Sequence, residues 1–127
     1  MAEGILRFIA SNEFEVFSAG IVPRELHPST IEAMNEIGVD VRRHQSKALE
    51  NFTGQSFDYV ITVSSDAQHR CLAFPGAEMI HMRFDDPLQV AFDERAHAFR
   101  RVRDEIMRRI RLFIAVTSRE RETKAAA

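Results

Sequence analysis

The sequence predicts an α/β fold, a small three-layer α/β/α domain built on a parallel sheet. Residues 59–63, Tyr-Val-Ile-Thr-Val, form a β-branched and aromatic run with almost no polar alternation, which is typical of a strand covered on both faces. Residues 93–118 repeat apolar side chains every three or four positions, which indicates one long amphipathic helix. Helical and extended patterns alternate along the rest of the chain, as they do in parallel α/β proteins.

The first part of the chain contains two predicted helices separated by one predicted strand. Residues 1–10 carry apolar side chains at helical spacing, although no Ser, Thr, Asp or Asn precedes them to cap the helix. Residues 14–19 favour a short strand. Pro28 favours the start of a second helix, because the first turn does not need its missing N–H group, and Gly38 favours the end of that helix.

The later part of the chain contains shorter elements before the long helix. Short helices are predicted over residues 48–52 and 65–71. Residues 78–84 alternate polar and apolar side chains, which indicates a strand near the edge of the sheet with one wet face. We therefore predict one domain over residues 1–118, followed by a charged, frayed tail over 119–127.

Composition restricts the class of protein. The 127 residues suit a single domain with its own core. With 17 basic and 19 acidic side chains the net charge is −2, so no strong field favours nucleic acid or an anionic membrane. No apolar run reaches the roughly 20 residues that span a bilayer, and no signal peptide is recognisable at the start. A single cysteine excludes an internal disulfide, and together these features predict a cytoplasmic protein.

Short motifs along most of the chain occur in the order and spacing of one known family. They are Met1-Ala2-Glu3-Gly4, Phe17-Ser18-Ala19-Gly20, His27-Pro28, Gly38-Val39-Asp40, His44-x-Ser46-Lys47, Phe57-Asp58-Tyr59-Val60-Ile61-Thr62-Val63, Phe74-Pro75-Gly76 and Phe84-Asp85-Asp86-Pro87. With these motifs the chain resembles the thioredoxin-coupled arsenate reductases, which share the fold of the low-molecular-weight protein tyrosine phosphatases. The resemblance extends from Met1 to about Ile114 and is specific for fold and family.

The resemblance also implies an absent segment. Family members begin with an apolar strand that leads into a Cys-x5-Arg loop, and the segment matching Met1 follows that loop. The sequence contains no such motif, because the sixth residue after Cys71 is Ala77. In such a loop, backbone N–H groups and a helix N-terminus hold an oxyanion and lower the pKa of the thiol. We therefore expect an N-terminally truncated homologue that lacks the nucleophile and is inactive in this form.

Two further positions correspond to the redox relay of the arsenate reductases. In that family two additional cysteines pass a disulfide outward from the nucleophile by thiol exchange. The first position is Ser64, directly after the predicted strand, and the second is Cys71. Because a serine cannot form a disulfide, we expect the relay to be broken at Ser64. The alternative for Cys71 is a small buried apolar residue, which is how most free cysteines behave.

Asp86 matches the aspartate that serves as general acid in the phosphatases. A carboxylic acid near the anion-binding loop is needed to protonate the departing oxygen, and a loop after a strand can place it there. The alternative is that Asp85-Asp86-Pro87 is a turn in which an aspartate caps the next segment. Family register favours a catalytic origin for Asp86, while the sequence leaves its present use open.

Metal and nucleic-acid sites are weaker candidates. His69 and Cys71 would supply half of a metal site, but no second pair stands at ligand spacing, so we predict neither a metal nor a cofactor. The arginines of the long helix alternate with acidic residues such as Asp104 and Glu105, which favours a solvated, salt-bridged face over a nucleic-acid surface. These arginines are Arg95, Arg100, Arg101, Arg103, Arg108, Arg109 and Arg111.

The implied absent strand also has a structural consequence. In the family it lies between the strands equivalent to residues 14–19 and 59–63, so both of these would carry unpaired ladder groups. Each buried unpaired group costs about 1–3 kcal/mol, which a marginally stable domain cannot absorb several times over. We expect the chain to pair the two strands directly, to recruit another segment, or to exchange elements with a second copy in a homodimer.

Three functional interpretations follow. The first is an arsenate reductase or low-molecular-weight phosphatase homologue whose natural form carries the strand and loop upstream of Met1, with thioredoxin as partner of that active form. The second is a non-catalytic binding or dimeric assembly module on the same scaffold, as Ser64 suggests. The third is a nucleic-acid binder through the arginine face, which the interleaved acidic residues disfavour.

Overall fold

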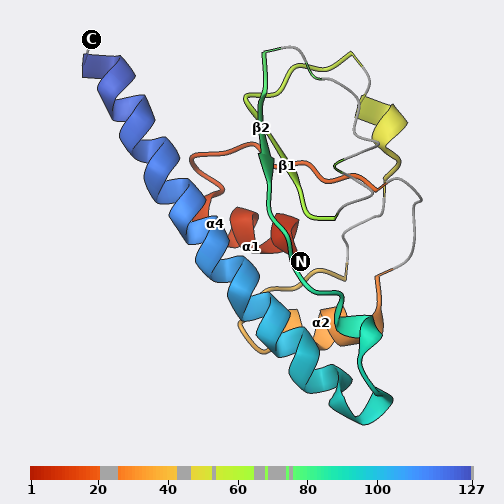
Figure 1. Ribbon diagram of the computed structural model, residues 1–127. Coiled ribbons are helices and arrows are strands. Elements are labelled where there is room, and N and C mark those ends of the chain that lie inside the picture. Colours follow the sequence, from red (N-terminus) through yellow and green to blue (C-terminus); the bar gives the residue numbers. More distant parts are fainter. Residues whose placement is uncertain are drawn as a thin grey trace.

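A long helix and a small parallel sheet define the architecture. In Figure 1, α4 (Arg95–Ala126) runs along one side of the molecule, with the shorter helices and the sheet packed beside it. The predicted α/β class is confirmed. None of the helices in the described part of the chain is long and apolar enough to cross a membrane. The computed structural model describes residues 1–20, 26–42, 47–52, 54–64, 68, 74 and 76–126.

The sheet pairs the two strands that the sequence predicts most clearly. Strand β1 (Tyr59–Thr62) lies parallel to β2 (Glu78–His81), and the ladder runs in register from their first to their last residues. Backbone bonds continue it at both ends, where Glu78 N–H donates to the Asp58 carbonyl at 2.9 Å and Met82 N–H donates to the Thr62 carbonyl at 2.8 Å. The parallel pairing is confirmed, although the second strand ends at His81 instead of residue 84.

The predicted strand over residues 14–19 is wrong. The segment is irregular in the structure, and only the next residue, Gly20, forms an isolated parallel bridge, to Ala48. A strand requires a neighbour that supplies a ladder, and no described residue does so for this segment. Ring contacts hold it in place instead. They join Phe14 to Tyr59 and Phe113 at centroid distances of 6.5 and 5.5 Å, and Phe17 to Phe52 and Phe57 at 5.9 and 5.8 Å.

The two predicted N-terminal helices are confirmed as α1 (Ala2–Ala10) and α2 (Pro28–Asn35). As expected, no side chain caps the start of α1. Helix α2 begins with Pro28 at its first position, and the turn after it ends at Gly38, whose φ of 81° suits glycine.

The remaining elements differ in detail from the sequence prediction. The predicted helix over 48–52 is the 3-10 turn η1 (Leu49–Phe52). Two further 3-10 turns, η2 (Pro87–Gln89) and η3 (Phe92–Glu94), precede α4, which continues past the predicted end at Ser118 to Ala126. The predicted helix over 65–71 lies outside the described residues except for Gln68.

The main core lies between α1, α2 and α4. Gly4 on α1 allows this close packing, because a Cβ atom there would lie 2.9 Å from Val41 Cγ1 and 3.2 Å from Met34 Cε. Helix α4 contributes an apolar stripe at helical spacing, as the sequence predicts. The buried residues of this cluster are Ile5, Leu6, Ala10, Met34, Val39, Val41, Val102, Ile106 and Ile110.

Candidate functional site

The carboxyl ends of β1 and β2 form the edge at which an α/β sheet places its ligands. Ser64 follows β1 by two residues, and its side chain is exposed. The Ser64 carbonyl accepts a hydrogen bond from Gln68 N–H at 3.0 Å. The position of Ser64 at the end of the strand therefore agrees with the position that the sequence predicts.

A polar pair joins the ends of the two strands and was missed by the sequence reasoning. Thr62 is buried, and its hydroxyl lies 2.8 Å from Nδ1 of His81, directly opposite in the parallel register. A hydroxyl can donate or accept, so the bond is satisfied with either neutral tautomer of the ring. The sequence has no local signal for this pair. Thr62 and His81 are distant along the chain and meet only through the register of the two strands.

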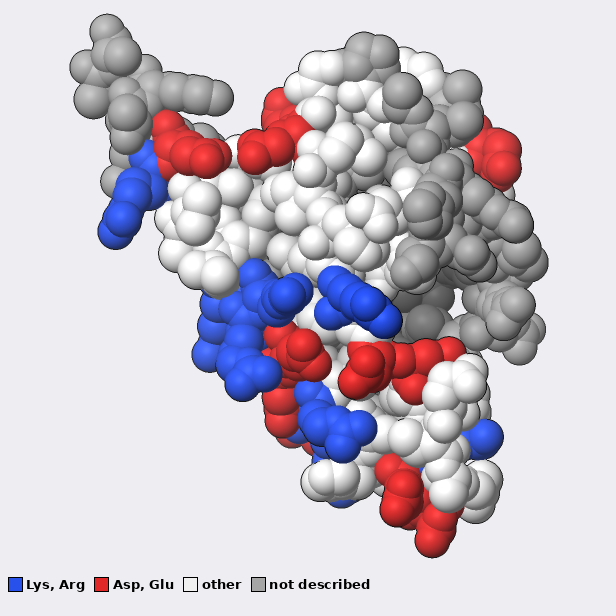
Figure 2. All heavy atoms as spheres, in the orientation of Figure 1, with Lys and Arg blue, Asp and Glu red and all other residues white. Residues whose placement is uncertain are grey.

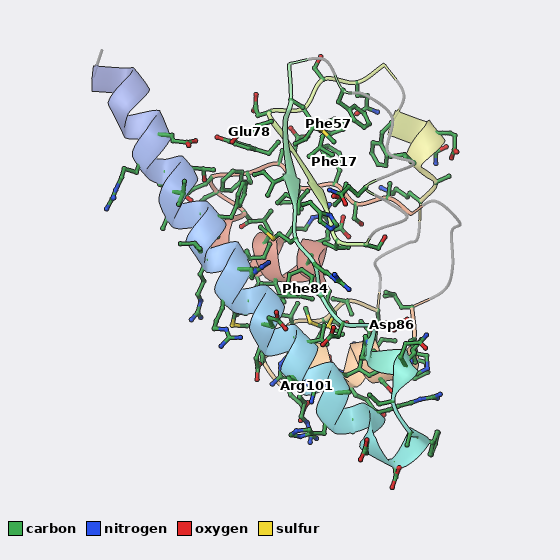
Figure 3. All side chains as sticks on the ribbon, in the orientation of Figure 1. Phe17, Phe57, Glu78, Phe84, Asp86 and Arg101 are labelled. Atoms are coloured by element: carbon green, nitrogen blue, oxygen red, sulfur yellow. The ribbon has the colours of Figure 1, made fainter. Side chains whose placement is uncertain are left out.

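Asp86 lies beyond the end of β2 and caps η2. Its Oδ1 accepts the Leu88 N–H at 2.9 Å and its Oδ2 accepts from Nε2 of Gln89 at 3.4 Å. Figure 3 shows Asp86 at the opposite end of the sheet from Phe17 and Phe57, which lie near the start of β1. The capping turn is thus present, and Asp86 is exposed.

The remaining predicted site residues cannot be placed relative to the strand ends. Cys71, the second relay position, lies outside the described residues, and so does His69, so neither can be placed relative to Ser64. Within the described ranges no three His, Cys, Asp or Glu side chains converge as a metal site would require.

The amino group of Met1 is an additional titratable group at the start of α1. Burial lowers its pKa below the ordinary value of 8.0, and the nearby carboxylate of Glu3 opposes that shift. Glu3 also pairs with Arg7 one turn later at 3.3 Å. The first turn of α1 therefore carries both the buried amine and an ion pair.

The arginines of α4 divide into bound and exposed groups. Arg100 Nε donates to both carboxylate oxygens of Glu36 at 2.8 and 2.9 Å, and this bond lowers the pKa of Glu36 and raises that of Arg100. Arg103 is buried and donates to the Ala33 carbonyl at 2.9 Å. Figure 2 shows basic and acidic side chains interleaved over α4, which supports the predicted salt-bridged face.

A shallow depression of about 530 Å³ lies away from these residues. It is formed by the end of α1 and the irregular segment after it, and none of the predicted site residues lines it. The Arg7 guanidinium crosses it to donate to the Val16 carbonyl. The depression therefore belongs to the packing of the N-terminal region and not to the strand-end site.

Comparison with known proteins defines the class. The family model described as low molecular weight phosphotyrosine protein phosphatase matches residues 1–124. The chain belongs to this family.

Within that class the similar proteins are arsenate reductases. Arsenate reductase 2 of Staphylococcus saprophyticus is 40% identical over 114 residues, covering 89% of this chain and 84% of that protein. An arsenate reductase of Shouchella clausii is 38% identical over 116 residues with the same coverage. A solved arsenate reductase in its oxidized state superposes with a TM-score of 0.76 at 25% identity, covering 90% of this chain and 85% of that one. Another in its reduced state gives 0.72 at 26% identity, with coverage of 91% and 86%.

Proposed function

We propose that this chain is an arsenate reductase homologue on the low-molecular-weight phosphatase scaffold, and that the 127-residue polypeptide alone does not turn over arsenate or phosphate esters. The observation that carries the proposal is chemical. The sequence has one cysteine, Cys71, which no arginine follows at the spacing of an anion-binding loop. Without a thiolate ringed by N–H donors, neither a phosphoenzyme nor an arsenic–thiol intermediate can form.

The relay positions support the same proposal. Ser64 occupies the strand end where the family carries a cysteine, so a disulfide cannot pass through that position to Cys71. We assign Asp86 to the position of the family general acid, and its side chain is exposed in the turn that follows β2. The scaffold thus keeps one acid group of the reaction while the sulfur chemistry is incomplete. Thioredoxin is accordingly a partner only of a form that carries the complete set of cysteines.

Turnover by the purified chain tests the proposal directly. We expect no hydrolysis of p-nitrophenyl phosphate and no thioredoxin-coupled arsenate reduction above the buffer blank. Arsenate reductase 2 of Staphylococcus saprophyticus, assayed in parallel, serves as the positive control for the coupled reaction. Turnover that co-elutes with the chain through two chromatographic steps would contradict the proposal, and its loss in Cys71→Ala would identify that thiol as the nucleophile.

A second candidate function, an assembly module, is favoured by the backbone of β1 at Ile61. The backbone N–H groups of Glu78 and Met82 donate to the carbonyls of Asp58 and Thr62. The backbone N–H and C=O groups of even-numbered residues in β1 therefore point toward β2. The backbone N–H and C=O of Ile61 therefore point to the opposite edge, where no described residue bonds to them. An open strand edge is a template for another strand, so a second copy of the chain is the proposed partner.

Light scattering after size exclusion tests this assembly over a range of concentrations. We expect a concentration-dependent dimer that Ile61→Pro abolishes, because proline removes the outward N–H while leaving the ladder to β2 intact. Circular dichroism checks that the variant is folded. A monomer at every concentration for the unmodified chain would exclude assembly through this edge.

A further inference from the structure

Helix α4 carries a row of four exposed side chains spaced four residues apart, here called the α4 ridge (Arg108, Leu112, Val116 and Glu120). Side chains at this spacing lie one above the other on a helix, so the row forms a continuous ridge on its surface. The two central members are apolar, Leu112 with 65% and Val116 with 48% of its surface exposed. The two ends are exposed and oppositely charged, Arg108 toward the N-terminus and Glu120 toward the C-terminus.

The α4 ridge lies on a different side of the helix from the residues that hold α4 against the molecule. The buried side chains of the same stretch include Ile110, Phe113 and Thr117, and the Phe113 ring contacts Tyr59 of β1 at a centroid distance of 5.2 Å. Figure 2 shows an uncharged surface over this part of α4, with basic side chains below it. Covering Leu112 and Val116 would remove apolar area from water, which favours association.

The charges at its two ends make the α4 ridge complementary to itself. When two copies pack antiparallel about a two-fold axis between positions 112 and 116, Leu112 of one copy faces Val116 of the other. The same symmetry brings Arg108 of each copy to Glu120 of the other. A parallel pair would bring like charges together at both ends, so the charges select the antiparallel arrangement.

The spacing of the row suits contact between two helices. In the commonest class of helix crossing, at about −50°, rows of side chains four residues apart interdigitate and therefore lie alongside each other. The α4 ridge is about 18 Å long at the rise of an α-helix, so its charged ends flank the apolar centre without neutralising each other. The neighbouring Arg109 is turned toward its own chain, with its guanidinium carbon 5.7 Å from the centre of the Phe84 ring.

We propose that the α4 ridge is a surface for weak antiparallel self-association, with a second copy of this chain as its occupant. Two apolar side chains and one charge of each sign per copy bury less area than the roughly 1,600 Å² of a stable interface, so the association is transient. The ridge is on a different element from the backbone of β1 at Ile61, and its association does not require strand pairing. It is also independent of the proposed reductase ancestry and of any turnover.

Sedimentation equilibrium of the Ile61→Pro chain, from about 10 μM to about 1 mM, measures the ridge without strand pairing. Size exclusion dilutes the sample, so a transient dimer of this kind dissociates on the column and is not counted there. We expect a reversible monomer–dimer equilibrium in the cell. Circular dichroism checks the fold, which exposed substitutions on α4 should leave intact.

Charge reversal tests the antiparallel arrangement. Arg108→Glu and Glu120→Arg should each raise the dissociation constant about tenfold, because each turns two attractions across the axis into two repulsions. Arg111→Glu makes the same charge change about 100° around the helix from Leu112, and this matched control should change the constant less than about twofold. Equal effects of Arg108→Glu and Arg111→Glu would overturn the proposal, since net charge alone would explain them.

Mixing the two charge variants gives a result that only the antiparallel ridge predicts. Arg108→Glu has an acid at both ends of the ridge and Glu120→Arg has a base at both ends, so each variant pairs with the other and not with itself. We expect the mixture to form heterodimers with about the affinity of the unreversed chain. A mixture that associates no better than its separate components would overturn the proposal.

NMR of the unmodified chain supplies a readout that needs no variant to fold. The amide signals of Leu112 and Val116 should shift as the concentration rises from about 10 μM to about 1 mM, while the amide of Arg101, earlier on α4, should not. Amide signals at positions 112 and 116 that stay unchanged over this range would overturn the proposal.

Discussion

Asp86 sits at the N-cap of η2, where its Oδ1 accepts the Leu88 N–H and its Oδ2 accepts from Gln89. Replacing Asp86 by Ala leaves this N–H without its side-chain partner, and we expect the free energy of unfolding to fall by about 1 kcal/mol. Asp86→Asn keeps an acceptor oxygen and should lose only a few tenths of that amount. Urea unfolding of the two variants side by side measures the difference. Equal losses in both would show that charge, and not capping, governs the stability of this turn.

Ser64 offers a test of the family relay at the level of one atom. Under the proposed function Ser64 corresponds to the first relay position and Cys71 to the second, so replacing the Ser64 hydroxyl by a thiol would supply both sulfurs. We expect Ser64→Cys to form an internal disulfide under mild oxidation, provided that the two Cα atoms lie within about 7 Å. Mass spectrometry after alkylation detects the loss of both free thiols, and Ser64→Cys with Cys71→Ala is the matched control. Two alkylated thiols in the oxidised sample would mean that the loop does not keep the relay geometry.

Sequence patterns located the site residues along the chain but not their partners. The positions of Ser64 after a strand and of Asp86 in a capping turn follow from local patterns, because a strand run and an Asp-Pro turn are each encoded by neighbouring residues. The bond between Thr62 and His81 depends on strand register, which is set by tertiary packing. It could not be read from the sequence for that reason.

At the scale of elements, Arg103 joins α4 to α2. Its Nη1 donates to the Ala33 carbonyl at 2.9 Å and to Glu36 at 3.2 Å, and its side chain is almost fully buried. Arg103→Met keeps much of the buried volume but leaves the Ala33 carbonyl unpaired, so we expect unfolding to become easier by about 1–3 kcal/mol.

A second arginine of the same helix is the control. Arg108 is exposed, and Arg108→Met should change the free energy of unfolding by no more than about 0.5 kcal/mol. Urea unfolding of both variants gives the comparison. Equal effects would show that helix propensity or net charge, and not the contact with α2, determines the loss.

The elements differ in how well the sequence predicts them, because they depend to different degrees on distant residues. Helices α1, α2 and α4 and strand β1 have strong local periodicity, and all four were predicted. The segment over 14–19 has the same local character as a strand but no ladder partner, so its pattern alone was misleading. The end of β2 near His81 has the same cause, since no described residue continues the ladder after the Met82 N–H bond to the Thr62 carbonyl.

At the scale of the whole molecule, the pH dependence of stability separates into windows set by different groups. The pKa of Glu36 is lowered, first by its hydrogen bond from Arg100, so its contribution is present above about pH 4.5 and is lost as the pH falls below that value. The buried amine of Met1 acts in a higher window. Work above about pH 5 therefore separates the effect of the Met1 amine from that of Glu36.

Above about pH 5, burial of the Met1 amine determines whether the free energy of unfolding rises or falls with pH. The pKa of the Met1 amine is below 8.0 in the folded chain and near 8.0 in the unfolded chain, so between these values the unfolded state binds more protons. We therefore expect the free energy of unfolding of the 127-residue polypeptide to rise with pH up to about 8, with a slope of at most about 1.4 kcal/mol per pH unit. Nα-acetylation removes the titrating group, so the acetylated chain should lose this slope. Because the acetyl group also changes packing, the two slopes and not the absolute stabilities are compared. Identical slopes with and without the acetyl group would show that the Met1 amine is solvated in the folded molecule.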